Sequence, residues 1–159
     1  MKENQKSYSV KEATVKLMQY CAYRDRCHKE VEEKLTELRM IPAAKEQIII
    51  QLMQEDFLNE ERFARSFVRG KFRIKKWGKI KITQELKSKE VSAPIIKLGL
   101  TEIDKQKYIA TLYDIAEKKL EQLKEPNPYK KKRKLIEFLL RRGYESALVY
   151  DVVNEVLKS

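Results

Sequence analysis

A dense run of cationic side chains lies in the middle of this 159-residue chain. No acidic residue occurs between positions 62 and 84, so nothing nearby in the sequence neutralises these charges. Lysine and arginine grouped in this way bind polyanions, phosphate groups above all. A run of charges is also typical of a solvated helix face, but the local absence of acids favours a functional surface. We call residues 69–81 the basic stretch, and its cations are Arg69, Lys71, Arg73, Lys75, Lys76, Lys79 and Lys81.

Other residues extend this chemistry. Arg65 precedes the basic stretch, Trp77 lies within it, and a second run of cations follows Tyr129 much later in the chain. The rings of Trp77 and Tyr129 can pack against a helix, or they can stack on bases as aromatic side chains do in single-strand binding proteins. We expect binding of nucleic acid or of a nucleoprotein filament at Arg65, at the basic stretch with Trp77, and at the second run, which comprises Lys130, Lys131, Lys132 and Arg133.

The residues needed for metal binding or catalysis are sparse. Cys21, Cys27 and His28 are close in sequence, but no second cluster of ligands accompanies them, and His28 is the only histidine. We expect His28 to be exposed to solvent near the start of a helix. Carboxylate pairs such as Glu60 and Glu61 begin charged helices and lack the apolar pocket that shifts a carboxylate pKa. No phosphate-binding loop of the form GxxxxGK(S/T) occurs. We therefore predict a protein that is not an enzyme and has no metal and no cofactor.

Composition narrows the class of protein further. The chain has 35 Lys and Arg against 24 Asp and Glu, a net charge of +11. Residues 58–100 contribute +8 of this, residues 1–57 contribute zero, and residues 101–159 contribute +3. Neither an apolar run long enough for a membrane span nor an N-terminal secretion signal is visible, so we expect a cytoplasmic protein that does not enter a membrane. The lack of heptads favours a monomer.

The chain has only 4 Gly and 4 Pro, where average usage gives roughly 11 and 8, and this composition argues against an all-β fold, which needs many turns. Apolar residues instead recur at helical spacing. Ser9-Val10-Lys11-Glu12 is a capping box, and Asn59 and Ser92 are further helix starts. Nine helices and no convincing strand follow from this pattern, which predicts an all-α fold.

The helices group in threes, and a weak repeat supports the grouping. Val31, Leu35 and Met40 recur as Ile82, Leu86 and Val91, then as Leu135, Leu139 and Tyr144, at offsets of 51 and 53 residues. We predict three tandem three-helix repeats in an elongated, curved arrangement, each with a small core of its own. Their bounds are residues 1–57 (with a short N-terminal tail), 58–103 (strongly basic) and 104–159.

The middle of the chain also matches a known family. Leu58-Asn59-x-x-Arg62-Phe63-Ala64 is followed by Gly78 and then by Lys81-Ile82-x-x-Glu85-Leu86. In order and spacing these residues resemble the central signature of the RecX family, the bacterial regulators of the RecA recombinase. The phrase Leu139-Leu140-Arg141-Arg142-Gly143-Tyr144 is similar to the family's third-unit phrase.

Two departures from the family pattern stand out. Cys27-His28 occupies the place of a small polar helix cap, and Glu90 replaces the glycine expected before Val91. Without that glycine, we expect the helix around Leu86 to end without a residue in the left-handed conformation.

The resemblance implies a helical protein that binds in the groove of the RecA filament on single-stranded DNA. It implies inhibition of RecA's ATPase, strand-exchange and coprotease activities, and hence modulation of DNA repair, homologous recombination and the SOS response. The basic residues themselves leave two alternatives open. One is a DNA-binding helical module that does not depend on RecA, and the other is a scaffold for an acidic protein. We expect binding to bare DNA to be weak and sensitive to salt.

Overall fold

The computed structural model describes residues 7–158, and within them the chain forms nine α-helices and no strand, as predicted. The first three are α1 (Val10–Tyr23), α2 (His28–Glu37) and α3 (Pro42–Gln54). The capping box starts α1, because Ser9 Oγ accepts from Glu12 N at 3.1 Å and Glu12 Oε1 accepts from Ser9 N at 3.1 Å. Among the described residues, no helix combines the length and the apolar content that crossing a bilayer requires.

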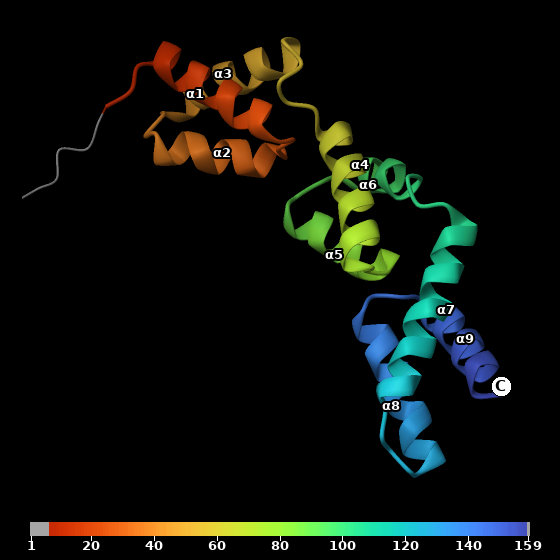
Figure 1. The fold of residues 1–159 in the computed structure, drawn as a ribbon. Helices are drawn as coiled ribbons and strands as arrows, with labels where there is room; N and C mark the ends of the chain where they lie inside the picture. The colour runs from red at the N-terminus through yellow and green to blue at the C-terminus, as the bar shows by residue number, and fades with distance from the viewer. Residues whose placement is uncertain (1–6, 159) are drawn as a thin grey trace, which may run out of the picture.

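The second group contains α4 (Glu60–Gly70), a π-helical turn η1 (Lys71–Lys75), α5 (Lys79–Ser88) and α6 (Ala93–Leu100). The third contains α7 (Lys105–Gln122), α8 (Pro128–Arg141) and α9 (Ser146–Lys158). Figure 1 shows the three groups following one another along an elongated, curved path, with the basic second group in the middle. The three tandem repeats predicted from the sequence are therefore present.

The repeat is also visible in the backbone. Arg39, Glu90 and Gly143 end the middle helix of each group with positive φ angles of 61°, 61° and 96°. The following residue in each case donates to a carbonyl five residues earlier, as in Val91 N to Leu86 O at 3.1 Å. This left-handed helix ending with a 6→1 hydrogen bond is the Schellman motif.

The expectation for Glu90 was therefore wrong. Glu90 adopts the left-handed conformation without being glycine, because the Schellman hydrogen bonds and the burial of Val91 hold the chain there. Arg39 does the same in the first repeat.

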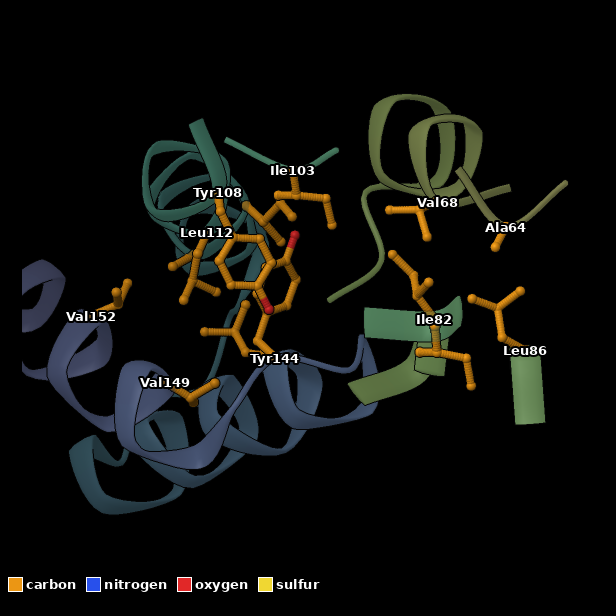
Figure 2. Packing of buried hydrophobic residues seen from close by; sticks show 14 of the residues in the cluster. Ala64, Val68, Ile82, Leu86, Ile103, Tyr108, Leu112, Tyr144, Val149 and Val152 are labelled. Carbon is orange, nitrogen blue, oxygen red and sulfur yellow. The ribbon is translucent and has the colours of Figure 1, made fainter. Parts of the chain in front are cut away.

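The hydrophobic cores differ from the prediction, which gave each of the three repeats a core of its own. The first repeat has its own core, built on residues such as Leu17, Leu35 and Ile48, and Leu58 packs into it. The second and third repeats share one continuous core, which joins Ile82 and Leu86 to Tyr108 and Tyr144. Figure 2 shows the aromatic rings at the centre of this shared core. Short helices with few apolar positions bury more surface together than apart, so the last two repeats act as one packed unit.

Contacts between the first and second repeats are mainly polar. Arg62 Nε donates to Asp25 at 2.7 Å, and its Nη1 lies 3.2 Å from Asp56. Lys29 Nζ donates to the Ser88 carbonyl at 3.0 Å. Cys27 adds an apolar contact, because its fully buried side chain belongs to the core of the second and third repeats.

The left-handed ending of α5 generates a stability prediction. Replacing Glu90 by glycine should raise the free energy of unfolding by about 1 kcal/mol, because a left-handed conformation costs a side-chain-bearing residue roughly that much. Denaturant unfolding followed by circular dichroism measures the change. Lys87→Gly, three residues earlier and inside α5, is the matched control and should lower stability by about 1 kcal/mol. A loss of stability in both variants would contradict this interpretation of Glu90.

Candidate nucleic-acid and filament interface

The exposed part of the basic stretch is a tight turn between α4 and α5. The π-helical turn follows α4 directly, and Lys76 then reverses the chain with a φ of 55°. Two backbone hydrogen bonds stabilise the turn. Lys76 N donates to Phe72 O at 3.0 Å, and Trp77 N donates to Lys71 O at 3.2 Å. Arg73, Lys75 and Lys76 are exposed on this turn, and so is Ile74 between them. The turn therefore presents three cations and one apolar side chain to solvent.

The end of α8 holds this turn in place through its backbone. Gly78 N donates to Arg142 O at 2.8 Å, and Ile80 N donates to Gly143 O at 2.9 Å. A Cβ atom on Gly78 would overlap the carbonyl of Gly143 and the nitrogen of Tyr144, so only glycine permits this approach. The third repeat therefore fixes the position of a turn that belongs to the second. We call this contact the glycine junction.

Side chains of the third repeat complete the glycine junction. Tyr144 OH donates to Lys76 O at 2.9 Å, and Arg142 Nη2 donates to Lys75 O at 2.8 Å. Tyr108 OH accepts from Lys79 N at 3.0 Å and also bonds to the Glu145 carboxylate. Burial raises the pKa of both tyrosines well above the ordinary range, and the Glu145 contact raises that of Tyr108 further. Both hydroxyls therefore remain neutral donors and acceptors at physiological pH.

Two of the predicted cations form ion pairs inside the second repeat. Arg65 Nη1 lies 3.3 Å from Glu102 and its Nε 3.2 Å from Glu61, while Arg69 Nη1 lies 3.0 Å from the same Glu102 carboxylate. These arginines connect α4 to the segment after α6. Their positive charge is thus partly neutralised, by Glu61 within α4 and by Glu102, which the local sequence does not reveal.

Trp77 is half-buried against the shared core, and two cations cover its ring. Lys71 Nζ lies 4.9 Å and Lys81 Nζ 4.5 Å from the ring centre, and Lys79 Nζ lies 4.9 Å from the ring of Tyr108. Such cation–π contacts fix lysine side chains while leaving their charge in place. The packing alternative for Trp77 therefore agrees with its surroundings better than an open stacking platform does.

The second run lies apart from the basic stretch. Lys130, Lys132 and Arg133 are exposed and Lys131 is half-buried near the start of α8, beside Tyr129, whose exposed fraction is 85%. The basic stretch contacts the opposite end of α8 at Gly143, which is thirteen residues after Lys130. At 1.5 Å per residue, that separation is about 20 Å. The structure therefore places the two groups of cations at two sites on the protein.

The fold brings three further cations to the basic stretch that the sequence did not point to. Lys118 and Lys119 on α7, and Arg142 after α8, line a hollow together with Lys76. No run of charges marks these residues, because they come from segments far apart in the sequence. The pairing of α7 with α8 is needed to find them.

The cysteines and His28 do not form a metal site. Across residues 7–158, no group of His, Cys, Asp and Glu side chains is arranged to hold a metal ion. Cys27 Sγ donates to Glu30 at 3.3 Å, and burial raises the pKa of its thiol to about 11. His28, which we expected to be exposed, is half-buried and lies 3.6 Å from Glu60 through its Nε2.

Models of known protein families match most of the last two repeats. Residues 59–100 match the second three-helix domain of RecX, and residues 106–153 match the third. The chain belongs to the RecX family. The prediction made from the central signature is thereby confirmed.

Curated RecX proteins are similar along most of the chain. A regulatory protein RecX from Clostridium acetobutylicum is 33% identical over 132 residues, which are 80% of this chain and 61% of that protein. One from Bacillus cytotoxicus is 26% identical over 147 residues, or 92% of this chain and 54% of that protein. The chain thus spans between about half and three fifths of the length of these relatives.

Solved structures share the fold. A crystal structure of RecX from Lactobacillus salivarius has a TM-score of 0.85 and 23% identity, covering 94% of this chain and 97% of that one. A second crystal structure, of a regulatory protein RecX, has a TM-score of 0.83 and 20% identity, covering 92% of this chain and 73% of that one. The three-repeat arrangement is therefore a RecX fold.

The glycine junction generates a prediction with an internal control. Gly78→Ala should lower the free energy of unfolding by about 2–3 kcal/mol, because the added methyl group would force two backbones apart. Gly70→Ala places the same methyl group in open space at the end of α4 and should raise stability by roughly 0.5–1 kcal/mol. Thermal and denaturant unfolding measure both. Equal effects of the two substitutions would contradict the close approach described here.

Proposed function

We propose that this RecX-family protein is a regulator that binds the RecA filament on single-stranded DNA and inhibits RecA's ATPase, strand-exchange and coprotease activities. In this proposal it acts in the cytoplasm as a monomer and modulates DNA repair, homologous recombination and the SOS response. The observation that supports the proposal most strongly is the position of the exposed basic turn. That turn lies in the middle of an elongated, curved RecX fold and is held by the glycine junction.

Shape and charge suit a partner that is itself extended. A filament groove offers a long surface with DNA phosphates near its axis, and a curved protein with its positive charge in the middle can lie across it. The cations of the turn supply attraction that is screened by salt and independent of sequence. The second run, about 20 Å away along α8, supplies a further contact to phosphate.

The outer repeats supply contacts to protein. In the first repeat, Ile41, Ile50 and Met53 are exposed, and in the third repeat Tyr150 and Leu157 are exposed. Apolar side chains on a protein surface contribute binding energy when a partner covers them. In this proposal they contact RecA subunits and make binding specific for the filament.

The exposed turn generates a test. Changing Arg73, Lys75 and Lys76 together to glutamine should weaken inhibition of RecA's ATPase on single-stranded DNA at least tenfold, because three phosphate contacts are lost. The concentration that halves the ATPase rate is the measurement. The glutamine substitutions leave Lys75 O and Lys76 O available to Arg142 and Tyr144, so the helical circular dichroism spectrum should not change.

The matched control removes the same charge elsewhere. Lys97, Lys105 and Lys107 are exposed outside the turn, and their change to glutamine should alter inhibition less than twofold. Equal loss in the two triple variants would mean that net charge, and not the turn, is responsible. No inhibition of RecA by the unchanged protein at micromolar concentration would contradict the proposed function and favour the DNA-binding module.

A further inference from the structure

The hollow beside the glycine junction gathers cations from three separate elements. Its volume is about 180 Å³. Lys76 comes from the turn before α5, Lys118 and Lys119 from α7, and Arg142 from the end of α8. Its other lining residues are Asp114, Ile115, Gln122 and Phe138.

The charges of the hollow do not cancel. Asp114 is its single acid, and its carboxylate lies 3.1 Å from Lys118 Nζ. Lys119 Nζ lies 4.5 Å from the centre of the Phe138 ring, which fixes the side chain without neutralising it. Lys76 and Arg142 have no carboxylate partner among the ion pairs of the described residues. Three of the four cations therefore keep an uncompensated charge at one place.

Arg142 has unused hydrogen-bonding capacity. Its guanidinium has five N–H donors, and Nη2 donates to Lys75 O at 2.8 Å. Its Nε is buried and has no hydrogen-bond partner among the described residues. A buried donor without an acceptor is destabilising, so an oxyanion beside this guanidinium would be stabilising.

From this arrangement we infer that the hollow formed by Lys76, Lys118, Lys119 and Arg142 is a binding site for a phosphate group. Two sources share this chemistry, namely a phosphate of the DNA backbone and a small phosphate compound free in solution. The flat face of Phe138 is covered by Lys119, so the site takes the phosphate and leaves the base outside. If the phosphate belongs to the DNA backbone, the inference rests on the proposed function, and it adds α7 to the surface that contacts DNA.

Two lysines can be removed without touching the glycine junction. The test compares Lys118→Gln/Lys119→Gln with a control on the same helix, Lys105→Gln/Lys107→Gln, which removes the same charge from the opposite end of α7. Each 159-residue protein is melted in inorganic phosphate and in chloride at equal ionic strength. We expect phosphate to raise the melting temperature of the unchanged protein and of the control equally, and to raise that of the hollow variant by less than half as much.

A DNA titration then separates the two sources. For an oligothymidine, the slope of log K against log salt should become shallower by roughly 0.7 in the hollow variant, the value for one phosphate, because Lys119 has no carboxylate partner among the described residues whereas Lys118 is paired with Asp114. If the hollow variant loses stabilisation by phosphate and also has the shallower salt slope, the ligand is a phosphate of DNA. If it loses stabilisation by phosphate and its salt slope is unchanged, the ligand is a small phosphate compound. Identical behaviour of the hollow variant and the control in both measurements would overturn the inference. That result would leave the ATPase test of the proposed function unaffected.

Discussion

The close approach of two backbones at Gly78 and Gly143 is the constraint on which the functional surface depends. The backbone at the start of α5 donates hydrogen bonds directly to backbone carbonyls at the end of α8. The rings of Tyr108 and Tyr144 are buried beside this contact. Because the contact joins the start of α5 to the end of α8, the second and third repeats share one core. The exposed cations are thus displayed from a fixed turn, which keeps the entropic cost of binding low.

The positive charge of the chain is divided between structural and exposed roles. Ion pairs that join separate segments are made by Arg62, Arg65 and Arg69, as suits a side chain that makes several directed hydrogen bonds. Among the described lysines of the turn and the hollow, Lys118 pairs with Asp114, and the others remain without carboxylate partners or lie over aromatic rings. The net charge of +11 therefore does not by itself describe the surface that a partner meets. Ion pairs partly neutralise Arg65 and Arg69, whereas several cations cluster around Lys76.

Periodicity and short motifs were sufficient to predict the helices and the repeat. The offsets of 51 and 53 residues reappear as the left-handed endings at Arg39, Glu90 and Gly143, and the capping box of Ser9 is present. The shared core could not be predicted, because it depends on Tyr108 of the third repeat packing against Phe72 of the second, with 5.9 Å between the ring centres. The ion pairs to Glu102 and the hollow depend in the same way on contacts between distant segments, which local sequence does not encode.

The central claim is that charge places this protein on DNA while the helical surface around the charge provides specificity for a filament. Binding to a RecA filament on single-stranded DNA and to the same DNA alone, each measured across a range of salt concentrations, tests it most directly. The account predicts much tighter binding to the filament, which persists at salt concentrations that abolish binding to bare DNA. Equal affinity and equal salt dependence for the two would contradict it.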